Sequence, residues 1–399
     1  MRRQGFTGTL TLLGAEGVAP YDRPPLSKEL LTRTEPAWLE AELGVDVVAL
    51  ADDVRLDDPA VGLLPAVEDG RLAHVVTTRS GARLEADAVV LAVGSAPVRP
   101  AGWEAARVLH SAADAAALRA LVRPGLRLTV VGAGWIGAEL AGVAAAAGAQ
   151  VTVVEAGATP LERQFGPVVG AHVAPWYAAA GVRLVTGAAV VEVRPDGVLL
   201  ADGTDVPADV VLAAIGARPA TSWLDGAVPL DARGAVPVDA TGAVEGVPGV
   251  WAVGDCATRE HPHLGRVPGG HWSAALHDPE PTARAVLGLA PDADAPAHAP
   301  YVFSQQLGHD LALFGVPPQG AEVVLRGEPG TPGGWAAFYL DPGTAGTAAD
   351  DGAARVRAVL LVDSARDVGA VRRAANRGAL RVDLDVARDP GRRLRDALV

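Results

Sequence analysis

Short apolar runs that end on a glycine alternate with alanine-rich stretches along much of this chain. The clearest case covers residues 126–156, where the apolar run 128–131 precedes a glycine-rich turn, an alanine-rich stretch and a second apolar run, 151–154. Short buried strands that alternate with helices are typical of a parallel sheet covered by helices. The pattern therefore predicts an α/β protein organised around this strand-helix-strand segment.

The residues before this segment predict a similar but incomplete unit. Residues 5–16 have the pattern of the end of a helix, a glycine turn and a buried strand that finishes on Glu16. The first strand and the glycine-rich turn of such a unit are not in the sequence, so we expect the chain to begin inside its first helix. A proline-rich loop and a helix-prone stretch to Leu43 follow. An antiparallel meander is expected at 63–87, with turns at Asp69-Gly70 and Ser80-Gly81, and a buried strand at 88–93 that stops at Gly94.

The remaining elements are predicted from apolar spacing and from glycine and proline breaks. Helices are expected at 111–121, with Ser111 or Asp114 as the N-cap, at 168–180, and at 271–287 with an interruption near Pro279 and Pro281. Strands are expected at 182–186, 190–194, 209–215 and 249–253. A linker at 291–300 then separates a C-terminal α+β unit with strands at 310–315, 321–325, 335–340 and 355–362, and helices at 367–376 and at the C-terminus.

The charge and cysteine content exclude several classes of function. The chain has 34 basic and 47 acidic side chains, a net charge of −13, which argues against nucleic acid or an anionic membrane surface as its main partner. The single cysteine, Cys256, excludes an intrachain disulfide and any mechanism that needs a pair of redox cysteines. No secretion signal and no uninterrupted apolar stretch of membrane-spanning length is present, so we expect a cytoplasmic protein.

The glycines of the central segment carry the first chemical prediction. Gly132 permits the tight turn after the strand, Gly134 lets a pyrophosphate approach the backbone, and Gly137 lets the helix pack close to the sheet. The helix start offers free N–H groups to phosphates. We also expect Ile136, in the same motif, to contact the cofactor. Glu155 has the spacing of the carboxylate that accepts ribose hydroxyls and repels a 2′-phosphate. We therefore expect NAD(H) rather than NADP(H), with a purely structural turn as the alternative.

Three further residues have a chemical and a structural interpretation. Asp255 ends a buried strand after a glycine, where an acid either meets the hydroxyls of a ligand or caps a helix. Lys28 is the only lysine of the chain, which favours a functional role over that of a surface lysine. Glu139 lies near the start of a helix, where the dipole favours a carboxylate in any case, so a functional and a purely structural role both stay open.

The cysteine and the histidines favour structural roles. Cys256 is expected to be a small buried residue rather than a redox thiol. His261, His263 and His271 surround a glycine-rich loop without the spacing of metal ligands, so we predict a solvated loop and no metal site.

Four stretches together carry a family resemblance: PYDRPPLSK (20–28), VVGAGWIGAELA (130–141), VWAVGDCA (250–257), and HWSAALH (271–277) followed by PYVFSQQ (300–306). In order and spacing they resemble the ferredoxin reductase branch of the FAD-dependent pyridine nucleotide oxidoreductases. The resemblance implies an α/β fold of two Rossmann-like three-layer domains, with the NAD domain inserted in a split FAD domain, and a C-terminal α+β domain. It implies an FAD domain at 1–109 and 226–298, an NAD domain at 110–225 and a C-terminal domain at 299–399.

The same resemblance implies roles for individual residues. Glu16 would hold the adenosine ribose of FAD, as Glu155 would hold that of NAD. Arg23 and Lys28 would reach the pyrophosphate and the flavin ring, and Lys28 and Glu139 would form the catalytic pair beside the nicotinamide pocket. The other implied cofactor contacts are Gly94, Asp255 at the ribityl chain, Trp272 at the isoalloxazine edge, and Gly216.

The implied activity is that of an NADH-dependent FAD reductase that passes electrons to a small iron–sulfur protein, a ferredoxin, of an oxygenase system. The nicotinamide and flavin rings would stack where the FAD and NAD domains meet, and Arg372, Arg373, Arg377 and Arg381 are candidates for a basic docking patch, against the alternative of a solvated arginine-rich helix. Three features depart from the family pattern: the missing first glycine loop, Phe303-Ser304 in place of an aromatic Trp-Ser pair, and the segment before Trp272. Two alternatives therefore stay open, a non-enzymatic NAD-binding protein unable to hold FAD, and a reductase with a small-molecule acceptor.

Overall fold

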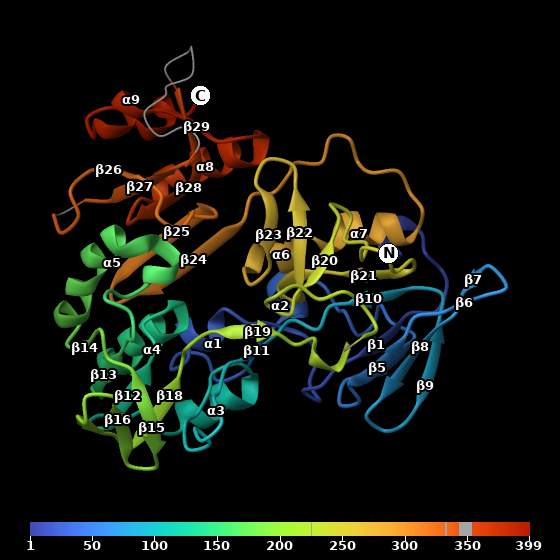
Figure 1. Cartoon of the computed structure of the whole chain (residues 1–399), viewed down its shortest axis with the longest axis horizontal. Coiled ribbons are helices and arrows are strands. Elements are labelled where there is room, and N and C mark those ends of the chain that lie inside the picture. Colours follow the sequence, from blue (N-terminus) through green and yellow to red (C-terminus); the bar gives the residue numbers. More distant parts are fainter. Residues whose placement is uncertain (225, 332, 343–352) are drawn as a thin grey trace. The chain divides into compact units, whose positions relative to one another are not determined.

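The computed structural model of the chain describes residues 1–224, 226–331, 333–342 and 353–399, and their contacts divide them into two compact units (Figure 1). Unit 1 comprises Met1–Pro25, Glu35–Ala96 and Ala217–Ala295, and unit 2 comprises Leu26–Thr34, Pro97–Gly216 and Pro296–Val399. Each unit is thus assembled from three separated segments. No helix within these described ranges is long and apolar enough to cross a membrane.

Unit 2 contains the strand-helix-strand segment that the sequence predicts. Four parallel strands lie in the order β14-β13-β12-β18. Val130, Val153 and Leu212 in these strands have no exposed surface, which explains why the strands are apolar throughout. The predicted strands are confirmed as β12 (Arg127–Val131), β13 (Gln150–Val154), β14 (Arg183–Val185) and β18 (Val210–Ala213).

Two helices of unit 2 begin as their sequences indicate. Helix α4 (Trp135–Ala146) follows the glycine-rich turn, and its buried alanines, such as Ala138 and Ala141, let it lie close to the sheet. Helix α3 (Ala112–Arg119) begins with a capping box, in which Ser111 accepts from the Asp114 N–H and Asp114 accepts from the Ser111 N–H. Both N-cap candidates therefore contribute to the same cap.

Helix α5 (Glu162–Ala179) begins earlier than the predicted start at Val168. Gly166, with φ 76°, interrupts the helical backbone before Pro167, so the sequence pattern predicts only the part of the helix after this break. The turn before the break is held by Phe165, which is 1% exposed. Tertiary packing, rather than helical spacing, stabilises that first turn.

A small antiparallel sheet follows in unit 2. Strand β15 (Val190–Arg194) has the predicted bounds, whereas β16 (Gly197–Leu200) and β17 (Asp205–Pro207) were not predicted. These two strands are short, and the turn residues around them hide their alternation.

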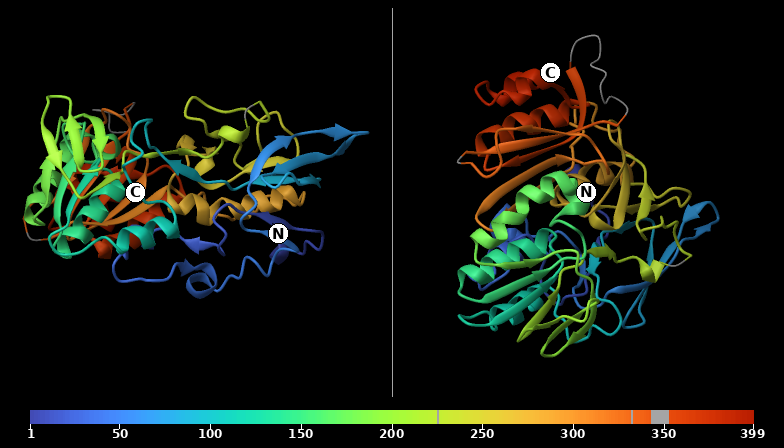
Figure 2. Two further views of the ribbon diagram at one scale, coloured as in Figure 1. Left: turned by 90° about the horizontal axis from the view of Figure 1, so that it is seen from below. Right: turned by 60° about the vertical axis from the view of Figure 1, so that its left-hand side comes forward.

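The C-terminal part of unit 2 is the predicted α+β unit. Its strands lie in the order β24-β25-β28-β27-β26, with β29 paired to β28, and helices α8 and α9 lie beside this sheet (Figures 1 and 2). Side chains of the two helices pack into a core with the strands. Four strands and the first helix lie near their predicted positions, whereas β24 and β29 were missed. The elements are β24 (Tyr301–Gln306), β25 (His309–Gly315), β26 (Val323–Arg326), β27 (Trp335–Leu340), β28 (Ala353–Val362), α8 (Ala365–Arg377), β29 (Arg381–Asp383) and α9 (Leu384–Arg388).

Unit 1 is built mostly from pairs and triplets of short strands. Strand β1 (Thr11–Leu13) pairs in parallel with β4 (Asp53–Arg55), and β10 (Val89–Leu91) pairs in parallel with β21 (Val250–Ala252). The prediction of a buried strand before Glu16 is wrong in one respect. Among the described residues β1 pairs with β4 alone, so Thr11 is exposed and Leu12 and Leu13 are only partly buried.

The predicted meander is confirmed, including both turns. The order is β5-β8-β9, and Asp69 (φ 49°) and Gly70 (φ 77°) form the turn between β6 and β7. The strands are β5 (Ala60–Leu64), β6 (Val67–Glu68), β7 (Arg71–Leu72), β8 (His74–Thr78) and β9 (Arg83–Ala86).

The other elements of unit 1 are short strands and helices. The predicted break between two helices is confirmed, because Pro279 is the first residue of the second one. The elements are β2 (Tyr21–Asp22), β3 (Ala37–Trp38), α2 (Leu39–Leu43), β20 (Val236–Val238), β22 (Ala257–His261), β23 (Gly265–Pro268), α6 (Trp272–His277) and α7 (Pro279–Val286).

Candidate functional site

The three glycines between β12 and α4 meet three different constraints. Gly132 has φ +105°, and a Cβ placed on it would lie 2.5 Å from the Ala214 carbonyl oxygen. A Cβ on Gly137 would lie 2.1 Å from the Gly132 carbonyl oxygen, so α4 requires a glycine at this point. A Cβ on Gly134 would meet only the side chain of Gln164, 3.9 Å away. The space beside Gly134 is therefore open, as it must be for a pyrophosphate to approach the backbone.

Glu155 stands at the carboxyl end of β13, beside this turn. Its Oε2 accepts from the Ala133 N–H (2.7 Å) and its Oε1 from the Gly157 N–H (2.7 Å). These bonds fix the carboxylate, which as an ionised group retains further acceptor positions for ribose hydroxyls. Ile136 follows strand β12 in the first turn of α4 and is 45% exposed. Gly216 follows the neighbouring strand β18, and it has φ +115° and open space around it. The carboxyl ends of parallel strands meet at one edge of a sheet, so the predicted NAD residues share that edge.

The Lys28–Glu139 pair that the family resemblance implies is present in unit 2. Lys28 Nζ donates to Glu139 Oε1 at 2.8 Å, and the side chains are 12% and 3% exposed. Ser27 Oγ donates to Glu139 Oε2 at 2.5 Å, and Ser304 Oγ donates to Glu139 Oε1. Lys28 Nζ also lies 4.9 Å from the centre of the Phe303 ring. A buried carboxylate with three donors orients the only lysine of the chain.

The segment that carries Lys28 is anchored beyond this pair. Lys28 ends the short helix α1 (Pro25–Lys28), and Leu30, two residues on, is 1% exposed in the core of unit 2. Arg119, in the last turn of α3, donates to the carbonyl oxygens of Leu30 (2.7 Å) and Thr34 (3.1 Å). The position of Lys28 is thus set by packing and by backbone hydrogen bonds.

A second cluster of predicted residues lies in unit 1. Asp255 accepts from Ser95 Oγ (3.0 Å) and from the Gly270 N–H (3.2 Å), which leaves part of its acceptor capacity unused. Gly94 has φ +66° with open space where a side chain would be. Trp272 Nε1 donates to Asp22 Oδ1 at 2.8 Å. These contacts bring parts of the PYDRPPLSK, VWAVGDCA and HWSAALH stretches into one unit.

The third group joins Glu16 and Arg23. Glu16 Oε2 accepts from the Tyr21 hydroxyl (2.5 Å), Glu16 Oε1 accepts from Arg23, and the Arg23 guanidinium lies 5.2 Å from the centre of the Tyr21 ring. The predicted ribose acid and the predicted pyrophosphate arginine are therefore direct partners in this structure.

Cys256 is fully buried, as predicted, and burial raises the pKa of its thiol. The prediction of a solvated loop is wrong for His271. Its Nδ1 accepts from the Ala274 N–H at 3.1 Å and caps α6. Burial lowers the pKa of His271 to about 4; Asp255 opposes this shift, and His277 adds to it. The ring is thus neutral at neutral pH, which the capping bond requires, because a protonated imidazole has no acceptor.

We expect this cap to make the free energy of unfolding decrease as the pH is lowered. The unfolded chain takes up a proton at His271 near pH 6.5, whereas the folded protein takes it up near pH 4, so the contribution is complete above pH 6.5 and is lost as the pH falls toward 4. At pH 5 the loss is about 2 kcal/mol. His271→Asn keeps a capping oxygen without titrating, so denaturant unfolding at pH 7 and pH 5 should show a smaller loss than in the wild type. Equal losses in the two proteins would contradict this assignment.

Several polar partners in these clusters were not predicted: Ser27, Ser95, Ser304 and Asp22. Ser27, Asp22 and Ser304 lie within the stretches that carry the resemblance, but no local pattern indicates which acid a serine meets across the chain. Ser95 directly follows Gly94, which ends a strand, and this position is the sequence feature that could have indicated Ser95 as a site residue.

The residues present fit the two cofactors that the resemblance implies. For NAD, the open space at Gly134, the first turn of α4 and the fixed carboxylate of Glu155 supply a phosphate site and a ribose acceptor. For FAD, Asp255 offers unused acceptor positions, and the backbone at Gly94 is open to close approach.

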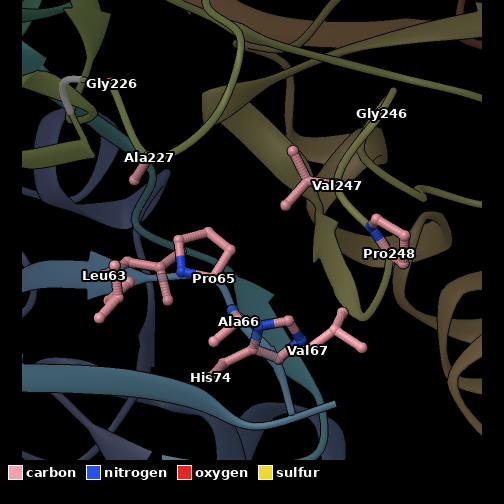
Figure 3. Close-up of a pocket in the computed structure, with 11 residues that line it drawn as sticks. Leu63, Pro65, Ala66, Val67, His74, Gly226, Ala227, Gly246, Val247 and Pro248 are labelled. Carbon is pink, nitrogen blue, oxygen red and sulfur yellow. Dashed lines mark hydrogen bonds between the residues drawn. The ribbon is translucent and has the colours of Figure 1, made fainter. Parts of the chain in front are cut away.

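A hollow of about 610 Å³ in unit 1 lies apart from these residues (Figure 3). Its lining is mostly apolar, and none of the predicted site residues contributes to it. Within the described part of the chain, Nε2 of the buried His74 at its edge has no hydrogen-bond partner, and burial lowers the pKa of this imidazole. The other lining residues are Leu63, Leu64, Pro65, Ala66, Val67, Gly226, Ala227, Gly246, Val247 and Pro248.

Comparisons with known proteins agree over nearly the whole chain. Residues 1–277 match the family described as pyridine nucleotide-disulphide oxidoreductase, and residues 301–398 match the family described as reductase C-terminal. The ferredoxin–NAD(+) reductase component of the p-cumate 2,3-dioxygenase system of Pseudomonas putida is 31% identical, with 100% of this chain and 94% of that protein covered. The corresponding anthranilate 1,2-dioxygenase component of Burkholderia cepacia is 32% identical, with 95% and 91% covered.

Solved structures show the same similarity. The crystal structure of Fdr9 superposes with a TM-score of 0.84 at 37% identity, covering 98% of this chain and 94% of that one. The putidaredoxin reductase in a covalent complex with putidaredoxin gives a TM-score of 0.83 at 26% identity, covering 98% and 92%. The similarity therefore includes both the fold and the sequence.

Proposed function

Because the chain belongs to the pyridine nucleotide-disulphide oxidoreductase family and carries a reductase C-terminal domain, we propose that it transfers electrons from NADH, through FAD, to a ferredoxin-type protein of an oxygenase system. The chain is an NAD(H)-dependent oxidoreductase, and its cofactors are FAD and NAD(H). The single structural observation that carries the proposal is the buried pair of Lys28 and Glu139 in the same unit as the NAD turn. Burying two charged side chains costs free energy, so their presence favours a functional role for the Lys28 charge, here in electron transfer.

The chain's own residues have separate tasks in this proposal. Gly134 and the start of α4 would bind the NAD pyrophosphate, and Glu155 would select NADH by repelling a 2′-phosphate. Bound FAD would supply the conversion of a two-electron hydride from NADH into single electrons, which an iron–sulfur centre requires. Lys28, held by Glu139, would place a positive charge where the flavin ring gains negative charge.

The remaining sequence-predicted contacts keep their implied places in this proposal. Glu16 and Arg23 would serve the adenosine and pyrophosphate end of FAD, and Asp255, Gly94 and Trp272 would serve its ribityl and flavin end. We assign residues 1–109 and 226–298 to the FAD domain, 110–225 to the NAD domain and 299–399 to the C-terminal domain. We place the protein in the cytoplasm, which agrees with its lone buried cysteine.

For the partner, we propose a small acidic iron–sulfur protein. The two relatives described above are named as ferredoxin reductase components, and one similar structure is a complex with putidaredoxin. Residues 365–399 contain nine arginines against five aspartates in a chain of net charge −13. Arg372, Arg373 and Arg377 are exposed on α8, whereas Arg381 is half-buried, and the Arg372 guanidinium stacks on Tyr301 at 4.8 Å. We therefore place the docking patch on α8.

The test follows electrons in two stages. The purified protein should absorb near 450 nm, and this absorbance should bleach when NADH is added under argon. The reaction of NADH with ferricyanide and with a [2Fe–2S] ferredoxin is then compared between wild type and the R372E/R373E variant.

We expect the R372E/R373E variant to have an apparent KM for the ferredoxin about tenfold higher or more at low salt, with ferricyanide reduction unchanged. A colourless protein would support the non-enzymatic alternative, and electron transfer to a quinone but to no ferredoxin would support a small-molecule acceptor. An unchanged KM would remove α8 from the docking site.

A further inference from the structure

Two buried side chains of β24 lie behind Glu139. Ser304 is 2% exposed and Gln306 is 1% exposed, whereas Gln305 between them is exposed, as expected for alternate residues of a strand. Ser304 Oγ donates to Glu139 Oε1, and Gln306 Nε2 donates to Ser304 Oγ at 2.9 Å. The three side chains form one chain of hydrogen bonds that ends at the carboxylate holding Lys28.

The direction of this chain follows from the number of protons available. A serine hydroxyl has one proton and can also accept. Because Gln306 supplies the bond that Ser304 accepts, the serine proton remains available to Glu139. Gln306 Oε1 is buried and has no hydrogen-bond partner in the described part of the chain, so the amide acts here as a donor, through Nε2. The glutamine thereby sets which way the serine points.

The backbone around these residues is fixed against α4. Leu307 and Gly308 form the turn between β24 and β25, and Leu307 has φ 52°, a conformation that is unfavourable for leucine. Its side chain is 9% exposed, and a Cβ on Gly142 of α4 would lie 3.0 Å from the Leu307 N. Gly142 is one turn beyond Glu139 in α4, so this contact fixes the position of β24 along the axis of the helix.

We propose that Ser304 and Gln306 are positioning residues, which orient Glu139 and through it hold the Lys28 ammonium in one place. Phe303 of the same strand adds a contact, because its ring centre lies 4.9 Å from Lys28 Nζ. The importance of this arrangement for electron transfer rests on the proposed function. The arrangement itself does not, because it is made entirely of residues of this chain.

The sole lysine allows a direct measurement of this arrangement. In protein labelled with ¹³C and ¹⁵N in lysine only, the side-chain signals come from Lys28 alone. We expect the Hε signals of the wild type to be displaced upfield by the Phe303 ring and to be unequal, as for an immobile side chain. S304A and Q306L should move them toward the positions of free lysine, whereas S304T, which retains a hydroxyl, should preserve them. Q305A is the matched control, since Gln305 is exposed on the same strand and bonds Asp310 instead.

Kinetic measurements then connect the arrangement to the reaction. At saturating NADH, S304A and Q306L should slow flavin bleaching about tenfold and leave the NADH dissociation constant within twofold, whereas Q305A should change neither. Thermal unfolding identifies any variant that fails to fold, and Q306N, a shorter amide, is used if Q306L does so. Unchanged Lys28 signals in folded S304A and Q306L would overturn the proposal. If NADH does not bleach the wild-type flavin, the proposed function fails, and the lysine signals still decide the positioning role.

Discussion

Replacing Glu139 with leucine should lower the free energy of unfolding by about 3–5 kcal/mol, because the substitution removes the acceptor shared by Lys28, Ser27 and Ser304. An ammonium that is 12% exposed then has no carboxylate beside it. Without this carboxylate Lys28 is no longer held in place, so the positive charge proposed to assist flavin reduction is lost from that position. We expect NADH to bleach the flavin at least tenfold more slowly in E139L. Urea unfolding and stopped-flow absorbance at 450 nm measure the two effects.

A double variant separates stability from function. K28M/E139L replaces both charges with apolar side chains and should recover much of the lost stability, because a buried ion pair often contributes little compared with apolar residues. It should not recover the rate, since the cation is still absent. Glu29→Gln is the control, because Glu29 forms a partly exposed pair with Arg33 four residues away, which contributes only about 0.3–0.5 kcal/mol. Recovery of the rate in the double variant would contradict a role for the Lys28 charge.

Substituting alanine at two glycines of the NAD turn should produce two distinct failures. Gly134→Ala places a Cβ in open space, 3.9 Å from Gln164, so the protein without NADH should unfold at the same temperature as the wild type. That Cβ nonetheless occupies the space proposed for the pyrophosphate, and we expect the NADH dissociation constant to rise about 100-fold. Calorimetric titration with NAD⁺ and thermal unfolding of the same sample measure both quantities.

Gly137→Ala should instead damage the fold. Its Cβ would lie 2.1 Å from the Gly132 carbonyl oxygen, a backbone atom that cannot rotate away, so α4 must shift from the sheet. Overpacking of this kind costs about 1–3 kcal/mol or more, and NADH binding should weaken as a consequence. A G137A protein as stable as the wild type, or a G134A protein that binds NADH normally, would contradict the division of roles between the two glycines.

The strongest local patterns gave reliable predictions. The strand, glycine turn, helix and acid of residues 126–156 were predicted correctly, as were the capping box at Ser111 and the turn at Asp69-Gly70. Each depends on neighbours close in sequence: a hydroxyl three residues from an N–H, or a glycine where φ must be positive. The elements that were missed or misplaced, such as β24 and the first turn of α5, are stabilised by distant side chains instead.

The site was predictable in its residue types but not in its contacts. The only lysine and the helical acid at position 139 could be singled out from the sequence, but that they pair was implied by the family resemblance alone. The sequence predicts a solvated loop at His271, because nothing local shows that its ring accepts from the Ala274 N–H and caps α6.

By itself, the sequence determined where the chain turns, where it can approach a phosphate closely, and which charges are too unusual to be incidental. Those properties are set by backbone stereochemistry and by side chains a few residues apart. Only the tertiary structure decided that Ser27, Lys28 and Ser304 would meet at Glu139, since these residues lie more than a hundred positions from it along the chain. Burial then makes the meeting specific, because a carboxylate withdrawn from water must find its donors among the groups that the fold brings to it.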